Sequence, residues 1–201
     1  MWFDYDNEKN AMTNVDPETG IWSMKIARKR HKTDYMLAAA IGCMYSPKRV
    51  ADVGCGPGYY CRIFKAYGWP IVHGFEGTAG IEGLGIYNSI FMVDLTKEIT
   101  GFEPYDLVIC LEVGEHIPPQ HEDMLINNIC KLAYKDLILS WAPLGQYSAS
   151  GHVNCRPRSY VINKFGMGGF RYLEDKTWIL QHRADFSWFK KNIMVFERLL
   201  I

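Results

Sequence analysis

Residues 50–60, VADVGCGPGYY, place three glycines at alternate positions, Gly54, Gly56 and Gly58, directly after an apolar run. An amphipathic stretch follows, so the glycines stand where a buried strand passes into a helix. Glycine permits positive φ and lets a ligand approach the backbone. We therefore expect a nucleotide-like ligand on this loop, with any side chain at Gly54 intruding on it. A tight turn that binds nothing is the alternative.

Apolar runs alternate with helical patterns along most of the chain. This alternation predicts an α/β protein with a parallel sheet covered on both faces, and an antiparallel edge made by the last two strands. A helical pattern also lies between those two strands. The expected strands are 49–53, 71–75, 89–93, 105–111, 136–142, 170–173 and 192–198, and the other expected helices are 22–41, 59–67, 157–166 and one that starts at Pro118–Pro119.

The composition excludes several classes of protein. The 201 residues suit one domain, and the formal net charge of zero provides no basic field to attract nucleic acid. No apolar run approaches the roughly 20 residues of a membrane span. The polar start, MWFDYDNEKN, does not resemble a signal peptide, and the six cysteines contain no CxxC pair. We expect a cytoplasmic protein that does not enter a membrane.

Carboxylates end the predicted strands and indicate the kind of ligand. Glu76 follows the glycine loop by about 20 residues, where a carboxylate can accept both hydroxyl protons of a ribose. Asp94 ends the next strand and suits an adenine amino group, or alternatively a helix N-cap. Asp52 precedes the glycines, where it would repel a pyrophosphate but suit a cation. The sequence therefore favours a ligand with a positive centre and no phosphates.

Four stretches together resemble a known family. VADVGCGPGYY, GFEG (74–77), VDL (93–95) and YDLVICLEVGEHIPP (105–119) are similar, in order and spacing, to the motifs of class I S-adenosylmethionine-dependent methyltransferases. The resemblance implies a single-domain, doubly wound, Rossmann-like sheet of seven strands, mostly parallel, with an antiparallel last strand. It implies a cap segment and helix at 1–45 that cover the cofactor, and an S-adenosylmethionine-binding domain at 46–201.

The same resemblance implies which residues contact the cofactor. Those of the glycine loop would hold its methionine half, those after the second strand its ribose, and those after the third strand its adenine. Two further residues would line it at the end of the fourth strand. In that order they are Asp52, Gly54, Cys55, Gly56 and Gly58; Glu76 and Gly77; Asp94 and Leu95; and Leu111 and Glu112.

The stretch EVGEHIPP, 112–119, brings two glutamates and a histidine to the ligand edge of the sheet. Its prolines disfavour helix, so we expect a short turn. Glu115 and His116 either fix this turn or take part in catalysis, with His116 as a general base for an acceptor hydroxyl. Alternatively, Glu112, Glu115, His116 and His152 bind a divalent cation that lowers the pKa of that hydroxyl.

The metal hypothesis draws on two similar groups of enzymes. Small-RNA 3′-end 2′-O-methyltransferases and ubiquinone-pathway O-methyltransferases carry a similar Glu-x-x-Glu-His turn. The RNA enzymes add a histidine after the fifth strand, where this chain has SGHVNCRP (150–157) with His152. The rest of the RNA-enzyme pattern is missing. This argues against an RNA substrate. We favour Glu115, His116 and His152 as catalytic residues without a metal, because Pro118 and Pro119 restrict the turn and the cofactor is expected to occupy Glu112.

These observations predict an S-adenosylmethionine-dependent enzyme that methylates an oxygen of a small molecule. The alternatives are a metal-assisted 2′-O-methyltransferase of RNA or another nucleic acid, an NAD(P)-dependent reductase, and a non-catalytic binding protein of the same fold. The reductase would need phosphate contacts and a Tyr/Lys pair, which the sequence does not offer. One basic cluster, KIARKRHK (25–32), is either a nucleic-acid contact or a solvated helix face.

Overall fold

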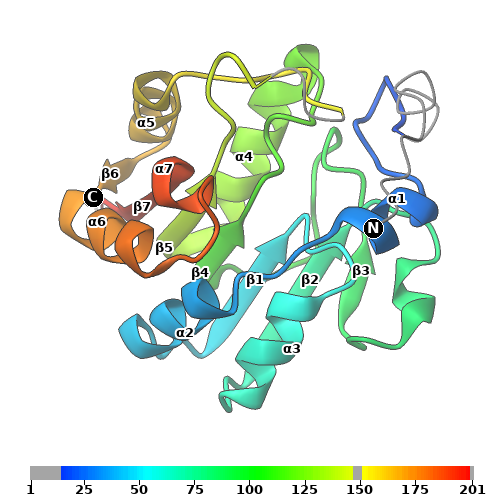
Figure 1. Ribbon diagram of the computed structural model, residues 1–201, viewed down its shortest axis with the longest axis horizontal. Coiled ribbons are helices and arrows are strands. Elements are labelled where there is room, and N and C mark those ends of the chain that lie inside the picture. Colours follow the sequence, from blue (N-terminus) through cyan, green and yellow to red (C-terminus); the bar gives the residue numbers. More distant parts are fainter. Residues whose placement is uncertain (1–14, 147–150, 200–201) are drawn as a thin grey trace, which may run out of the picture.

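Seven strands form one sheet in the order β3-β2-β1-β4-β5-β7-β6 (Figure 1). The computed structural model describes residues 15–146 and 151–199, so residues 1–14 of the expected cap lie outside it. β1 to β5 are parallel and β7 is antiparallel to both neighbours, which confirms the predicted fold class. The strands are β1 (Arg49–Val53), β2 (Ile71–Glu76), β3 (Ile90–Met92), β4 (Tyr105–Cys110), β5 (Ala133–Ser140), β6 (Phe170–Tyr172) and β7 (Ile193–Arg198).

The expected antiparallel edge made by the last two strands is present, because β6 and β7 pair in antiparallel orientation at one edge of the sheet. β7 is inserted between β5 and β6, and its first four residues are buried. β6 takes the edge with only three residues. A short strand suits an edge because it offers few unpaired backbone groups to other chains.

Helices cover both faces of the sheet (Figure 1). α2, α3, α6 and α7 enclose one apolar core, and α4 and α5 enclose the other. None of the helices among the described residues is long and apolar enough to cross a bilayer. The helices are α1 (Met24–Arg30), α2 (Tyr35–Met44), α3 (Tyr59–Ala66), α4 (Glu122–Leu132), α5 (Arg158–Met167), α6 (Glu174–Arg183) and α7 (Phe189–Asn192), with short 3₁₀ turns η3 (Ile81–Leu84) and η4 (Pro119–His121).

The single helix expected at 22–41 is wrong, because the chain forms α1 and α2 with an extended linker between them. Asp34 explains the break. One of its carboxylate oxygens caps α2 by accepting from Leu37 N at 2.8 Å. The other accepts from the backbone N–H groups of Asp185 and Phe186, each at 2.8 Å. These contacts fix the linker across the edge of the sheet, and sequence periodicity could not reveal them.

α1 and α2 take different positions, although both belong to the expected cap at 1–45. α2 is part of the core, since Leu37 and Ile41 are fully buried in the cluster that also holds α3 and α6. α1 is buried only at Ala27 and lies over the carboxyl edge of the strands (Figure 1). A domain division at residue 45 stays a prediction.

Removing the Asp34 carboxylate should destabilise the protein. We expect Asp34→Ala to lower the free energy of unfolding by about 2–4 kcal/mol, because it removes a helix cap and two charge-assisted hydrogen bonds from a buried position. Urea denaturation measures this. Asp185→Ala is the matched control, since Asp185 is exposed and contributes only its backbone N–H. A variant at position 34 as stable as the control would contradict the anchoring role.

Candidate functional site

A cavity of about 750 Å³ lies where β1, β2 and β4 end. This volume is within the range of small-ligand and cofactor sites, and the carboxyl edge of a parallel sheet is where such sites form. Two residues that were expected to touch the cofactor, Gly58 and Asp94, lie outside its lining. The other expected residues all line it: Asp52, Gly54, Cys55, Gly56, Glu76, Gly77, Leu95, Leu111 and Glu112.

Gly58 and Asp94 are occupied by local structure instead. Gly58 has a φ of 86° at the start of α3, and a Cβ there would lie 2.8 Å from Cβ of Tyr87. The Asp94 carboxylate accepts from Thr96 N at 3.0 Å and from Thr96 Oγ1 at 2.6 Å. It also pairs with Lys97 at 3.1 Å. Asp94 therefore closes a turn after β3, and it caps no helix.

The glycine loop is fastened to the end of β2 by Glu76. Its Oε2 accepts from Gly56 N at 2.8 Å. Its Oε1 accepts from Gly77 N at 2.9 Å and from Thr78 N and Oγ1 at 2.9 and 2.8 Å. A carboxylate oxygen offers about two acceptor positions. Oε1 is therefore fully used, whereas Oε2 keeps the capacity to accept one further hydrogen bond.

Glycine is required at 54 and 56 by contacts within the protein itself. Gly54 has a φ of 73°, and a Cβ there would lie 2.4 Å from a Val113 methyl group. Val113 and Gly54 both line the cavity, and the expectation that a side chain at Gly54 would also intrude on the ligand stays a prediction. Gly56 has a φ of 53°, and a Cβ there would lie 2.3 Å from Nδ1 of His31, whose ring packs on the loop.

Asp52 provides a carboxylate in the cavity wall beside the glycine loop. It is 3% exposed, and burial raises its pKa to about 7. The Cys61 thiol donates a hydrogen bond to its Oδ2 at 3.5 Å. A buried acid with a pKa near neutrality ionises when a cation is placed beside it. Asp52 therefore suits a positively charged ligand group.

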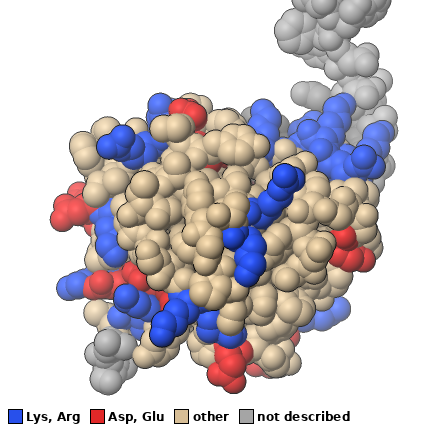
Figure 2. Space-filling model, turned by 90° about the horizontal axis from the view of Figure 1, so that it is seen from below, with Lys and Arg blue, Asp and Glu red and all other residues tan. Residues whose placement is uncertain are grey.

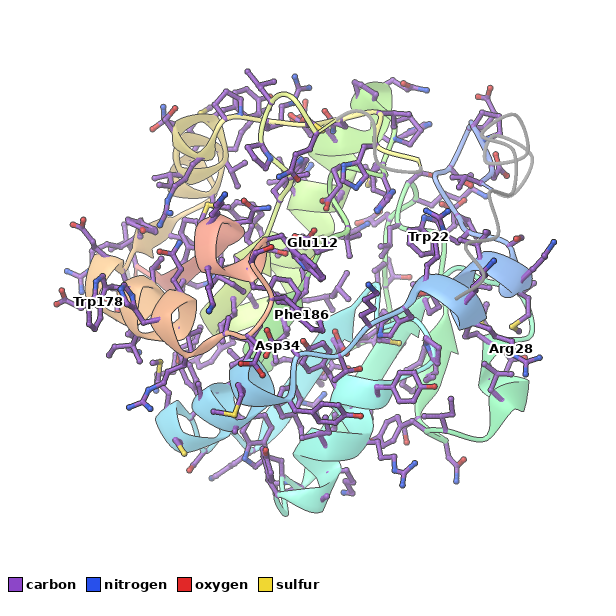
Figure 3. All side chains as sticks on the ribbon, in the orientation of Figure 1. Trp22, Arg28, Asp34, Glu112, Trp178 and Phe186 are labelled. Carbon is purple, nitrogen blue, oxygen red and sulfur yellow. The ribbon has the colours of Figure 1, made fainter. Side chains whose placement is uncertain are left out.

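Glu112 lines the cavity with a strained backbone, because its φ of 55° is unusual for a residue other than glycine. Ser140 at the end of β5 holds it in place. Ser140 Oγ accepts from Glu112 N and donates to Glu112 Oε1, both at 2.8 Å. Burial raises the pKa of the Glu112 carboxyl. Figure 3 shows Glu112 beyond β4, with Trp22 opposite it in the N-terminal segment.

The predicted turn after β4 is present, and it brings His116 to the cavity wall. The turn is closed by a bond from His116 N to Val113 O at 3.0 Å. His116 Nδ1 lies 3.1 Å from the carbonyl oxygen of Gly151. Because a carbonyl can only accept, Nδ1 carries the hydrogen and Nε2 of the neutral ring keeps its lone pair. Burial lowers the pKa of His116 to about 4, so the ring is neutral at physiological pH.

His152 faces His116 across the same end of the cavity. The two ring centroids are 4.8 Å apart, and Trp22 also packs edge-on against His116, with ring centroids 4.9 Å apart. The segment that carries His152 is fixed to the turn, since Glu115 O accepts from Val153 N and Asn154 N at 2.8 and 2.9 Å. Burial lowers the pKa of His152 as well.

Glu115 is fully buried directly behind these two histidines, outside the cavity lining. Neither of its carboxylate oxygens has a hydrogen-bond partner among residues 15–146 and 151–199. Burial raises its pKa well above the ordinary value, with the nearby Glu112 as a further cause. One ligand atom from each of Glu115, His116 and His152 can be chosen so that all lie within 4.8 Å of one another.

A buried carboxylate on α4 supports the His152 segment. Glu122 is 3% exposed, and its Oε2 accepts from Asn154 Nδ2 at 3.0 Å and from Arg156 Nε at 2.6 Å. Its Oε1 accepts from the Tyr160 hydroxyl. These bonds place the His152 loop relative to α4, so the two histidines are held from both sides.

A sequence model of a family described as "Methyltransferase domain" matches residues 25–138, which is more than half of the chain. The chain belongs to the class I S-adenosylmethionine-dependent methyltransferases. It is a methyltransferase whose cofactor is S-adenosylmethionine, as the sequence predicted. A comparison with curated proteins finds no match.

Solved structures share the fold of this methyltransferase at low sequence identity. CalS10, an amino pentose methyltransferase from Micromonospora echinaspora, is 16% identical, with a TM-score of 0.66 over 87% of this chain and 95% of that one. Magnesium protoporphyrin IX methyltransferase from Synechocystis PCC 6803, with bound cofactor, is 20% identical, with a TM-score of 0.57 over 88% and 79%. The methyltransferase domain of bacterial CtHen1-C is 16% identical, with a TM-score of 0.58 over 83% and 96%.

The residues of this methyltransferase fit its cofactor. Asp52 suits the cationic amino group, and Glu76 Oε2 retains capacity for a ribose hydroxyl. Sequence patterns missed part of the wall, because its residues lie outside the family motifs. Helical periodicity predicted one helix at 22–41 and a helical pattern between the last two strands, and it did not show which faces meet the cavity. The lining residues that were not predicted as cofactor contacts include Ile21, Trp22, Lys29, Arg30, His31, Lys32, Trp188, Phe189 and Lys191.

The raised pKa of Asp52 makes cofactor binding dependent on pH. We expect the affinity for S-adenosylhomocysteine to rise as the pH increases from about 5.5 to about 7.5, by at most roughly tenfold per pH unit, because an ammonium group favours ionised Asp52 and its binding releases a proton. Calorimetry in buffers of different ionisation enthalpy measures that proton. Asp52→Asn should bind weakly at every pH. The same slope in this variant would show that another group titrates.

Proposed function

We propose that this methyltransferase transfers the methyl group to an oxygen of a small molecule. The pair of neutral histidines at one end of the cavity is the observation that carries this proposal. His116 Nε2 keeps a lone pair for a hydroxyl proton, and His152 faces it at 4.8 Å between ring centroids. A neutral imidazole accepts a hydrogen bond from an alcohol or phenol and can then take its proton.

The small size of the acceptor is inferred from the enclosure of this end of the cavity. Trp22 closes one side of His116, and Gly20 packs so closely that a Cβ there would lie 2.1 Å from the carbonyl oxygen of His116. The protein has no net charge, so it has no overall positive field that would attract a long polyanionic acceptor such as a nucleic acid. The names of two proteins of similar fold, an amino pentose methyltransferase and a magnesium protoporphyrin IX methyltransferase, agree with a small acceptor.

S-adenosylmethionine supplies a methyl group that its sulfonium has already activated. The protein's main task is therefore to hold the acceptor oxygen in line with that methyl group, about 3 Å away, and to exclude water. Trp22 and the turn at 113–117 provide the exclusion. His116 orients the hydroxyl through Nε2 and takes its proton as the oxygen acquires its new bond.

The low pKa of His116 is compatible with this role. An alcohol oxygen becomes strongly acidic while it bonds to the methyl carbon, so a weak base suffices late in the transfer. The ring must be unprotonated to act, and with a pKa of about 4 it remains so at all higher pH values. Activity that depends on His116 is thus fully present near neutrality and is lost as the pH falls through about 4.

A second candidate function is a metal-assisted O-methyltransferase, including one that acts on the 2′-hydroxyl of RNA. The specific observation in its favour is Glu115, a buried carboxylate without a partner among the described residues, beside His116 and His152. The donor set fits a divalent cation, and the bond from His116 Nδ1 to Gly151 O is of the kind that orients metal-binding histidines. Glu115, His116 and His152 would hold the ion, with Glu112 nearby. A bound cation would lower the pKa of the acceptor hydroxyl.

Replacement of His116 tests the proposed function. We expect His116→Gln to bind S-adenosylhomocysteine within about threefold of the wild type but to transfer methyl groups about 10²–10⁴-fold more slowly, the range for loss of a general base. Transfer is followed with labelled S-adenosylmethionine and a mixture of small hydroxylated and aminated acceptors. Mass spectrometry should locate the methyl group on oxygen. Methylation on nitrogen or carbon, or of added RNA alone, would refute the proposal.

A chelator separates the two candidate functions. In the metal-free version, turnover survives EDTA, and the purified protein contains no stoichiometric metal. In the metal-assisted version, EDTA stops turnover while S-adenosylhomocysteine still binds, and elemental analysis finds an ion that Glu115→Gln loses. We expect the first result, because the positive φ of Glu112 and its bonds to Ser140 hold this carboxylate at the cofactor wall.

A further inference from the structure

The mouth of the cavity carries basic side chains from two separate parts of the chain. Lys29, Arg30 and Lys32 come from α1 and the linker that follows it, and Lys191 comes from α7. All four are exposed. The protein as a whole has no net charge, so this is a local excess of positive charge. In Figure 2, blue side chains gather at the upper right of the molecule, on the side where α1 lies.

Acidic wall residues do not balance these cations. The acids among the described lining residues are Asp52, Glu76 and Glu112, and all three are at least partly buried in the interior of the site. Every exposed charged side chain among the described lining residues is therefore basic.

Two lysines at the mouth of the cavity differ from several lysines elsewhere in that they form no ion pair with a described carboxylate. Lys97, Lys131 and Lys164 each pair with a carboxylate within 3.1 Å. In the part of the chain that the structure describes, Lys32 and Lys191 have no such partner. Unpaired cations that surround a cavity raise the local concentration of anions and lower the cost of bringing one inside.

Lys32 is held in place by an aromatic side chain. Its ammonium group lies over the ring of Trp188, 5.8 Å from the centroid, and Trp188 is itself a wall of the cavity. Lys191 is one helical turn away, since its backbone N donates to Trp188 O at 3.0 Å. Trp188 therefore brings the linker cation and the α7 cation to the same side of the mouth, with Phe189 beside them.

We propose that the methyl acceptor is an anion, and that Lys32 and Lys191 bind its carboxylate or phosphate group at the mouth of the cavity while its hydroxyl reaches His116. This inference rests on the proposed function in taking the acceptor to be a small hydroxylated molecule that enters this cavity, whereas the preference of the mouth for an anion does not depend on which acceptor atom is methylated. Ammonium groups bind carboxylate and phosphate oxygens through charge-assisted hydrogen bonds. Trp188 and Phe189 offer an apolar surface for the body of the molecule.

The experiment uses three probes that differ in charge and share an aromatic ring. Benzoate, phenyl phosphate and the neutral benzamide are each titrated calorimetrically into the full chain saturated with S-adenosylhomocysteine. We expect at least one of the two anions to bind about tenfold or more tightly than benzamide. The stronger of the two indicates whether carboxylate or phosphate is preferred. Equal binding of benzamide and both anions, or no binding of either anion, would overturn the proposal.

Paired substitutions connect this preference to the named residues. Lys32→Gln with Lys191→Gln should reduce the anion preference to within about twofold. The matched control is Lys25→Gln with Lys190→Gln, because these lysines are exposed on α1 and α7, close in sequence to Lys32 and Lys191, and do not line the cavity. The control should keep the preference. A double variant at 32 and 191 that keeps it, or a control that loses it, would refute the assignment.

The cofactor's own carboxylate is the competing ligand for these cations. The affinity of each double variant for S-adenosylhomocysteine is therefore measured first. We expect it to change less than about threefold. If the Lys32 and Lys191 variant instead loses cofactor affinity, the cations serve the cofactor and the proposal is wrong. Methyl transfer to nitrogen or carbon would contradict the proposed oxygen acceptor but would leave the measured anion preference unchanged. Failure of the proposed function can therefore be distinguished from failure of the proposed anion site.

Discussion

The hydrogen bonds of one carboxylate hold the cofactor edge together. One oxygen of Glu76 accepts a hydrogen bond from Gly56 N, and the other accepts hydrogen bonds from Gly77 and Thr78. Glu76 therefore joins the loop after β1 to the loop after β2. The two strands are in parallel register, Val53 beside Phe75, and they end at the same level. Without the hydrogen bonds of Glu76, the glycine-containing loops after β1 and β2 would have little side-chain packing to hold them together at the carboxyl edge of the sheet. The cavity, the cap above it and the turn after β4 are all arranged around this junction.

Carboxylates collect at this edge at some energetic cost. Asp52, Glu112 and Glu115 all have raised pKa values, with burial as the main cause for each. In a fold selected only for stability, apolar side chains would occupy these positions. Their presence is explained by ligands that bring positive charge or hydroxyl protons into the site. The strained φ of Glu112 belongs to the same pattern, because backbone strain is retained where a side chain must be held in one direction.

The sequence was informative where local pattern decides structure. The strands follow from apolar runs, and the glycine loop and the carboxylates at strand ends follow from residue types at fixed spacings. Most of the residues predicted to contact the cofactor line the cavity. It failed where distant contacts decide. The break between α1 and α2 depends on backbone donors at 185 and 186, and the interior position of β7 depends on its pairing with both β5 and β6. The local contacts of Asp94 with Thr96 and Lys97, two and three residues away, did not follow from the sequence pattern either.

The contact between Asp34 and the backbone at 185–186 spans about three quarters of the chain, a separation of 151 residues. The ribosome delivers the N-terminus first, so the linker that carries His31 and Lys32 exists long before its anchor does. Contacts of such separation form late, because closing a long loop costs entropy before any packing compensates for it. The sheet and its glycine loop can assemble earlier from neighbouring strands. The roof of the cofactor site is thus completed only after the last third of the chain has been synthesised and folded, and partial chains would present an open binding edge.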